Sequence, residues 1–161
     1  MFETILVPLD GSDLAEEAID PAGELARCFG SRIVLVQAVD SLAMRMSQPP
    51  AIIEAPAAAA ASVDVFQSAL EAEKEGAHRY LAEVRDRLAA GGGRVEAFVG
   101  EGPATDVILS VAREQGAGVI VMSTHGRGGL GRLVFGSVAD GILRRSETPV
   151  LLIRSRERPK T

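Results

Sequence analysis

Residues 121–153 read VMSTHGRGGLGRLVFGSVADGILRRSETPVLLI, and this stretch decides the expected fold. An apolar run ends in Met122, and a glycine-rich loop with two arginines and no carboxylate follows it. Gly136 and Ser137 then open an amphipathic segment that leads to a second apolar run, Val150–Ile153. Glycines let backbone N–H groups approach an anion, and a helix N-terminus presents its positive dipole end to it. The stretch therefore predicts a strand, a phosphate-binding loop, a helix and a strand.

The rest of the chain alternates between short apolar runs and amphipathic segments. The run Thr4–Leu9 predicts a strand buried on both faces, and Ile33–Val39 predicts a second buried strand. Two further strands are predicted at Arg94–Val99 and Gly118–Met122. The amphipathic segments predict four helices, at Asp13–Phe29, Asp64–Ala90, Pro103–Gln115 and Ser137–Arg145. Pro21 should kink the first of them, and Pro103 should occupy the first helical position of the third. With Val150–Ile153 as the last strand, this order predicts a single α/β domain whose five-stranded parallel sheet carries helices on both faces.

Two segments fall outside this alternation. Ser41–Ser62 contains several prolines and a run of alanines, and it is expected to form a flexible loop or lid. Residues 155–161 are expected to form a polar C-terminal tail after the domain.

Composition excludes several classes of protein. The net charge is −5 with no basic surplus, so nucleic acid is not an expected partner. No run is long and apolar enough to span a bilayer, and the first residues do not resemble a signal peptide. The one cysteine, Cys28, rules out an internal disulfide framework and is expected to be buried as a small apolar residue. We therefore expect a cytoplasmic protein that is not bound to a membrane.

Three distant segments are expected to meet at one edge of the sheet. Ligands of parallel sheets bind beyond the carboxyl ends of the strands, where the winding reverses. This rule brings together Pro8–Asp10, Ala38–Asp40 and Ser123–Gly131.

Two helix starts compete for an anion at this edge. The first, at Ser12, carries Asp13, Glu16 and Glu17, whose charges repel a phosphate. The second, at Gly136-Ser137, has arginines upstream and meets its first acid only a turn later. Charge favours the second start, although Gly136-Ser137 also fits a plain helix cap.

Other motifs carry less information. Gly126–Gly131 matches the dinucleotide pattern G-x-G-x-x-G, but that fold needs an acidic residue at the end of the next strand, where this chain has Arg154 and Ser155. His125 fits a structural role better than a phosphate contact, and the histidines and cysteine show no metal-binding spacing. Asp10 suits either a ribose ligand or the start of a turn, and Ala38 suits either an adenine contact or simple packing. No catalytic residue is assigned.

From Ile5–Ser12 to Pro149–Ile153 the chain resembles the universal stress protein family. The ATP-binding members carry glycine, two residues, glycine, nine residues, and then glycine with serine or threonine. Gly126, Arg127–Phe135 and Gly136-Ser137 match this pattern, whereas Ser123 stands where the first glycine is expected. Serine still offers a backbone N–H there, but it does not readily adopt a positive φ.

The resemblance implies a Rossmann-like fold, similar to that of the adenine nucleotide alpha hydrolases, with strand order 3-2-1-4-5. It implies ATP, or ADP or AMP, with Mg²⁺ or Mn²⁺, in the crevice. Asp10 would bind the ribose, and Pro8, Ala38 and Met122 would border the adenine. The phosphates would be held by Gly126, Gly136, Ser137 and Val138, with Ser123 and Arg127 in the same loop.

The resemblance also implies a homodimer joined through Val150–Ile153, acting with an unknown protein partner as a nucleotide-dependent stress-response switch. An apolar edge strand suits such pairing, because an unpaired edge invites aggregation. Two alternatives stay open, namely a dimeric interaction module that binds no nucleotide and a slow ATPase. No general base is evident in the sequence, so hydrolysis is expected to be slow at most.

Overall fold

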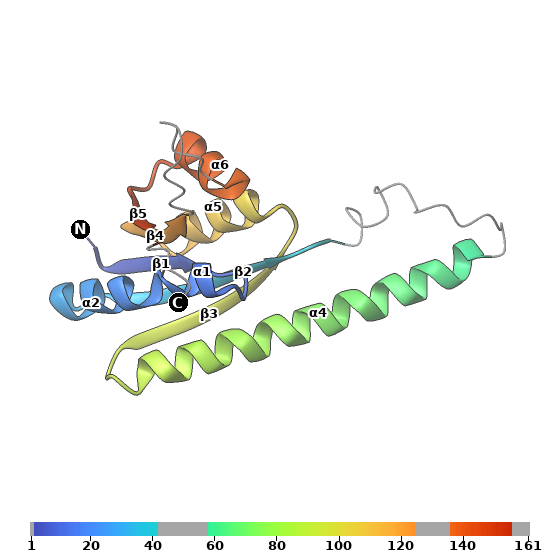
Figure 1. Ribbon diagram of the computed structural model, residues 1–161, viewed down its shortest axis with the longest axis horizontal. Coiled ribbons are helices and arrows are strands. Elements are labelled where there is room, and N and C mark those ends of the chain that lie inside the picture. The colour runs from blue at the N-terminus through green and yellow to red at the C-terminus, as the bar shows by residue number, and fades with distance from the viewer. Residues whose placement is uncertain (1, 42–57, 125–135, 156–161) are drawn as a thin grey trace, which may run out of the picture.

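Five parallel strands form one sheet of order β3-β2-β1-β4-β5, which confirms the predicted fold class and strand order (Figure 1). The computed structural model describes residues 2–41, 58–124 and 136–155. The strands are β1 (Thr4–Pro8), β2 (Arg32–Val39), β3 (Arg94–Glu101), β4 (Val119–Thr124) and β5 (Val150–Arg154). The chain winds outward from β1 to β3 and then returns to the other side of β1, so the winding reverses between β1 and β4.

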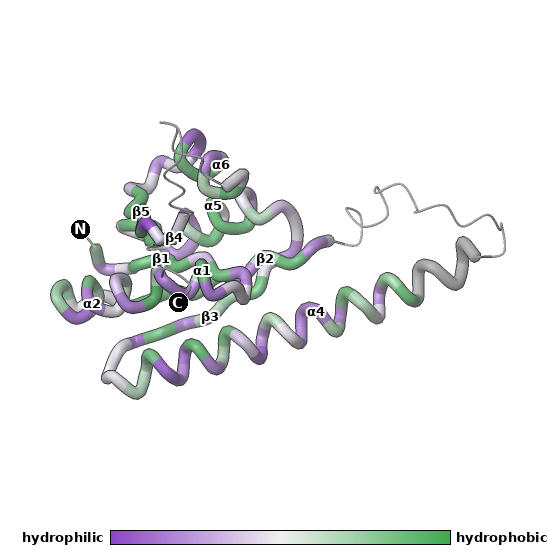
Figure 2. The backbone as a smooth tube through the Cα atoms, viewed as in Figure 1, coloured by the Kyte–Doolittle hydropathy of each residue, from purple (hydrophilic) through white to green (hydrophobic). Residues whose placement is uncertain are grey.

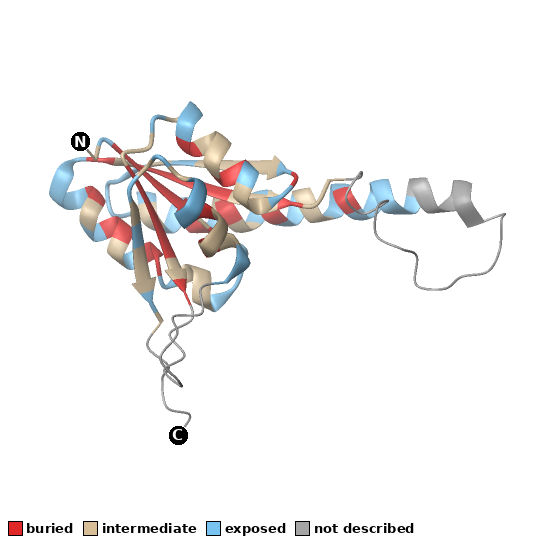
Figure 3. Cartoon of the chain, turned by 90° about the horizontal axis from the view of Figure 1, so that it is seen from above, coloured by how far each residue is buried: buried red, intermediate tan, exposed pale blue. Residues whose placement is uncertain are grey.

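Alternate side chains of the strands build two separate apolar layers. Ile5 and Val7 face one layer, which is covered by α1 (Asp13–Glu16), α2 (Ile19–Phe29) and α4 (Ala58–Ala89). Leu6 faces the other layer, which is covered by α5 (Ala104–Glu114) and α6 (Ser137–Arg145). The central strands are apolar and buried, as Figures 2 and 3 show. A sheet covered on both faces requires such continuous apolar strands.

The predicted helix Asp13–Phe29 is wrong in one respect, because it is two helices. α1 ends at Glu16 and α2 begins at Ile19. Proline has no N–H, so a continuous helix would leave the carbonyl of residue 17 without its helical partner at Pro21. The break moves Pro21 into the first turn of α2, where backbone N–H groups have no helical partner in any case. Glu17 and Ala18 keep right-handed helical dihedral angles and form i→i−3 hydrogen bonds, so the interruption expected near Pro21 is a short, tightly wound junction between α1 and α2.

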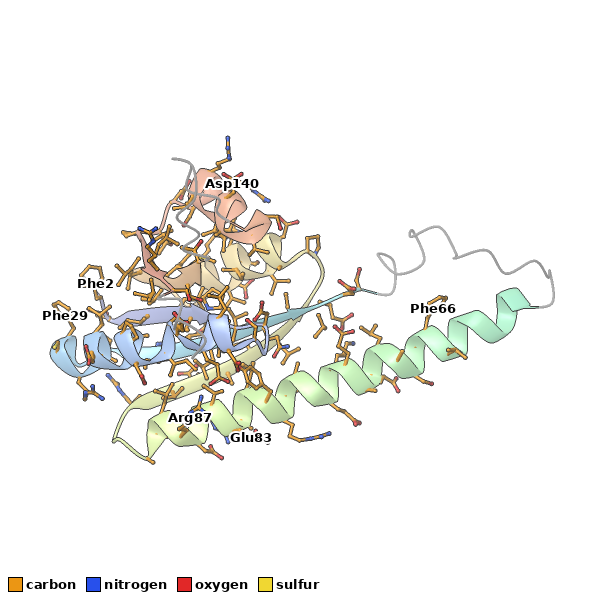
Figure 4. The ribbon with its side chains drawn as sticks, in the orientation of Figure 1. Phe2, Phe29, Phe66, Glu83, Arg87 and Asp140 are labelled. Atoms are coloured by element: carbon orange, nitrogen blue, oxygen red, sulfur yellow. The ribbon has the colours of Figure 1, made fainter. Side chains whose placement is uncertain are left out.

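Helix α4 begins at Ala58, earlier than the predicted Asp64, because alanine has the highest helix propensity. The predicted loop 41–62 is therefore wrong for residues 58–62, and residues 42–57 lie outside the described part of the chain. The N-terminal part of α4, with Phe66, extends past the sheet (Figures 1 and 4). None of the described helices is long and apolar enough to cross a membrane.

Three smaller expectations are corrected. Pro103 is the N-cap of α5 and not its first helical residue, because its ψ of 126° is extended. Cys28 is exposed, since it lies on the outer side of α2. Strand β4 continues past Met122, because Ser123 and Thr124 pair with Ile153 and Arg154 of β5. This last extension brings two hydroxyl side chains to the carboxyl end of the sheet.

Candidate functional site

A cavity of about 240 Å³ opens at the carboxyl ends of β1, β2 and β4, where the winding reverses. The described residues that line it come from all three strands, the start of α1, α5 and the first turn of α6. They are Pro8, Leu9, Asp10, Ser12, Leu14, Ala15, Val36, Ala38, Ala104, Ile108, Met122, Ser123, Thr124, Gly136, Ser137, Val138 and Ala139. This is the place where parallel α/β sheets bind their ligands.

Eight of the ten site residues expected from the sequence line this one cavity, namely Pro8, Asp10, Ala38, Met122, Ser123, Gly136, Ser137 and Val138. The other two, Gly126 and Arg127, lie outside the described residues, as does His125. Thr124 and Gly136, which flank residues 125–135 in the sequence, both line the cavity. The convergence argued from strand order is therefore seen in the structure.

Asp10 forms the turn that leads from β1 into α1. Its Oδ1 accepts hydrogen bonds from the backbone N–H of Ser12 at 3.0 Å and from the Ser12 hydroxyl at 2.6 Å. The Ser12 oxygen in turn accepts from the backbone N–H of Ala15 at 3.1 Å and caps α1. The turn role left open for Asp10 is thus present, and both hydrogen bonds use one carboxylate oxygen.

Ser123 is tied to α1 by its side chain. Its hydroxyl donates a hydrogen bond to the backbone carbonyl of Leu14. The Leu14 carbonyl also accepts from the backbone N–H of Glu17 at 3.2 Å, so the hydroxyl adds a second hydrogen bond to it from outside the helix. The serine that replaces the expected glycine therefore holds α1 against the end of β4.

Thr124 is a site residue that was not predicted from the sequence. It is 6% exposed, it lines the cavity, and its Oγ1 has no hydrogen-bond partner within the described structure. Alternation along β4 would have identified it, because Ser123 and Thr124 must face opposite sides of the sheet. Because β4 was predicted to end at Met122, the alternation was not extended to Ser123 and Thr124.

The start of α6 differs from the start of α1. Gly136 is the N-cap of α6, and no side chain of the described residues caps its first turn. The first acid of α6, Asp140, is paired with Arg144 at 2.9 Å on the outside of the helix (Figure 4). The uncapped N–H groups and the positive dipole end of α6 therefore face the cavity without a competing carboxylate.

Acidic groups gather near the other helix start. Burial, together with the negative charges of Glu16 and Asp10, raises the pKa of Tyr80 on α4. Arg87 of α4 pairs with Glu16 at 2.8 Å (Arg87 is labelled in Figure 4). The cavity thus lies between an acidic side at α1 and a positive dipole at α6. Among the described residues there is no group of three or more histidine, cysteine or acidic side chains that would hold a metal ion.

The sheet order and the switch-point cavity define an α/β protein of the Rossmann-like class. Comparison with known proteins gives the family: a family model described as "Universal stress protein family" matches residues 1–154. The chain belongs to the universal stress protein family. A universal stress protein of Thermus aquaticus is 31% identical over 154 residues, which cover 96% of this chain and 100% of the relative.

Solved structures show the same fold. The structure of protein MJ0577 has a TM-score of 0.75 at 23% identity and covers 98% of this chain and 99% of its own. A universal stress protein in complex with cAMP has a TM-score of 0.66 at 26% identity, and the match covers 94% of this chain and 97% of that protein's chain. An Arabidopsis thaliana member with AMP bound has a TM-score of 0.64 at 17% identity, and the match covers 96% of this chain and 92% of that protein's chain.

Proposed function

We propose that this protein binds an adenine nucleotide in the switch-point cavity, with ATP as the ligand favoured by the motif Gly126–Ser137. The single observation that carries the proposal is the uncapped N-terminus of α6 facing the same cavity as the Asp10 turn. Related structures with cAMP and AMP bound support an adenine ligand. The two walls suit a phosphate at one end and a ribose at the other.

Each part of the nucleotide has a chemical counterpart in the cavity. Apolar groups of Ala38, Ile108 and Met122 suit the faces of an adenine ring. Asp10 uses Oδ1 for its turn, so Oδ2 is available to accept from ribose hydroxyls. The N–H groups after Gly136 suit phosphate oxygens. A Mg²⁺ or Mn²⁺ ion on the nucleotide would take its oxygens mainly from phosphate and water, as Mg²⁺ commonly does.

Binding is favoured over rapid hydrolysis. A hydrolase needs a group that activates or orients water at the terminal phosphate. Asp10 is the one titratable side chain among the described residues that line the cavity, and it lies at the proposed ribose end. We therefore infer a binding protein whose hydrolysis is slow, in which the nucleotide state changes contacts with a protein partner in the cytoplasm.

We also infer a homodimer that pairs through β5. This strand lies at the edge of the sheet, and Leu151 on it is 38% exposed. An apolar hollow of about 230 Å³ adjoins it, lined in part by Phe2 and Val150. A second copy that adds its own β5 would cover this apolar edge. Leu151→Lys should shift the mass in sedimentation equilibrium from dimer to monomer, and an unchanged mass would contradict this interface.

Two substitutions at Gly136 test the nucleotide site. Its φ is −59° and a Cβ there meets nothing within 4 Å, so a side chain fits without strain. Asp and Asn are equally good N-caps, and each should stabilise free α6 relative to glycine by about a few tenths of a kcal/mol. Gly136→Asp should nevertheless abolish ATP binding by placing a negative charge at the phosphate end, whereas Gly136→Asn should retain more of it. Calorimetric titration with ATP separates the two, and equal affinities for wild type and Gly136→Asp would refute the site.

A further inference from the structure

Thr124 carries a buried hydroxyl that the described fold does not use. The residue is 6% exposed, and its Oγ1 finds no partner among the described residues. A buried hydroxyl without a hydrogen bond has lost its contacts with water and gained none in exchange, so such groups are uncommon in stable proteins. Valine has nearly the same shape and would avoid this loss. We therefore expect the Thr124 hydroxyl to form its hydrogen bond with a ligand bound in the cavity.

We propose that the Thr124 hydroxyl binds a phosphate of the adenine nucleotide, together with the N-terminus of α6. This inference rests on the proposed function and adds to it a side-chain ligand at one of the two positions that the glycine pattern leaves unspecified. Thr124 and the first residues of α6 line the same cavity. A hydroxyl donates a stronger hydrogen bond to a charged phosphate oxygen than to a neutral acceptor.

Because side chains alternate along β4, the hydroxyls of Ser123 and Thr124 lie on opposite sides of the sheet. Met122 and Ile120 pack in the layer that α5 and α6 cover, so Thr124 lies on that same side of the strand. Val119 and Val121 pack in the opposite layer, where the Ser123 hydroxyl donates to Leu14. The Ser123 hydroxyl thus joins β4 to α1, whereas the Thr124 hydroxyl lies on the side of the sheet where α6 begins.

Placement on the α6 side favours a phosphate over the ribose. The ribose end is defined by Asp10, in the turn that leads to α1, whose helix covers the other layer. The phosphate end is defined by Gly136 and the uncapped turn after it. Thr124 precedes residues 125–135, which join it to Gly136 in the sequence.

The test compares Thr124→Val, which removes only the hydroxyl, with Thr124→Ser, which keeps it. Calorimetric titrations use adenosine, AMP and ATP as ligands for the full chain. Thr124→Val should weaken AMP and ATP about tenfold, as expected for a hydrogen bond to a charged group, and leave adenosine within about twofold. Thr124→Ser should bind all three ligands within about threefold of wild type. The ligand-free Thr124→Val protein should unfold at the same temperature as wild type or higher, because it loses an unpaired polar group.

Each other result has a distinct meaning. Equal weakening of adenosine and AMP, or no weakening of either, overturns the phosphate contact while the nucleotide site stands. A lower unfolding temperature of ligand-free Thr124→Val shows a structural hydroxyl and also overturns it. If wild-type protein binds neither AMP nor ATP, the proposed function itself fails, and the contact fails with it.

Discussion

Gly141 of α6 lies directly against Thr105 of α5. A Cβ added at Gly141 would come 2.8 Å from the Thr105 Oγ1 and 3.1 Å from its Cγ2. Rotation of the threonine cannot clear both positions, because any staggered χ1 leaves at least one of them occupied. The absence of a side chain at Gly141 therefore sets how closely α6 packs on α5. Both helices line the candidate site, so this contact also positions its phosphate end.

Gly141→Ala should displace α6 and weaken both stability and ATP binding. Overpacking costs about 1–3 kcal/mol, and the better helix propensity of alanine returns only about 1 kcal/mol. We expect a net loss of about 1 kcal/mol in urea unfolding and a several-fold weaker affinity for ATP.

The control for this prediction is the double variant Gly141→Ala with Thr105→Ala, which removes both close atoms. It should recover wild-type affinity and unfold at higher urea concentration than Gly141→Ala alone, as a double-mutant cycle would report. Additive effects of the two changes would show that the contact does not position α6.

Replacing Ser123 by the glycine of the family pattern should destabilise the protein. Ser123→Ala removes the hydrogen bond to Leu14 and should cost about 1 kcal/mol. Ser123→Gly should cost about 0.5–1 kcal/mol more, because glycine gains freedom in the unfolded chain. Since the hydroxyl faces α1, Ser123→Ala should bind ATP within about twofold of wild type. A tenfold loss of affinity in this variant would assign the hydroxyl to the ligand instead.

The sequence predicted the strands well, because the three central ones, β1, β2 and β4, are short, largely apolar runs that are mostly buried. It predicted the helix boundaries less well, since they depend on local competition. Pro21 stopped one long helix from forming, and the alanines before Asp64 extended another. The exposed position of Cys28 depends on which side of α2 faces the sheet, and an error of about half a helical turn reverses that expectation.

Asp10→Asn separates the turn role of this residue from its proposed ligand role. Asparagine also accepts hydrogen bonds in such turns, so the fold should lose less than about 0.5 kcal/mol. Loss of the charge should weaken adenosine and ATP alike, by about tenfold, because both carry the ribose. Titration calorimetry with both ligands measures this. Unchanged adenosine affinity would remove Asp10 from the ribose site.

Tyr80 should make stability fall at high pH. Burial and nearby acidic charges raise its pKa above the usual value near 10, so the folded state favours the neutral phenol. This contribution is complete below about pH 10 and is lost as the pH rises from there towards the folded-state pKa. Tyr80→Phe should show a shallower decline of unfolding temperature between about pH 9 and pH 11. Parallel curves for both proteins would contradict the raised pKa.

Most of the candidate site was accessible from sequence because backbone topology assembles it. Strand order alone brings together Asp10, Ala38 and Gly136. The roles of the Ser123 and Thr124 hydroxyls could not be predicted from the sequence, because they depend on where β4 ends and on which side of the sheet each residue faces. A strand predicted two residues longer would have distinguished Ser123 from Thr124.

The central claim is adenine nucleotide binding, and thermal unfolding with and without ATP tests it most directly. Protein freed of bound nucleotide should unfold several degrees higher in saturating ATP, since a ligand at 100 times its Kd stabilises the folded state by about 2.7 kcal/mol. For a chain of this size that stabilisation corresponds to a rise of roughly 5–10 °C. An unchanged unfolding temperature in millimolar ATP, ADP and AMP would contradict the account.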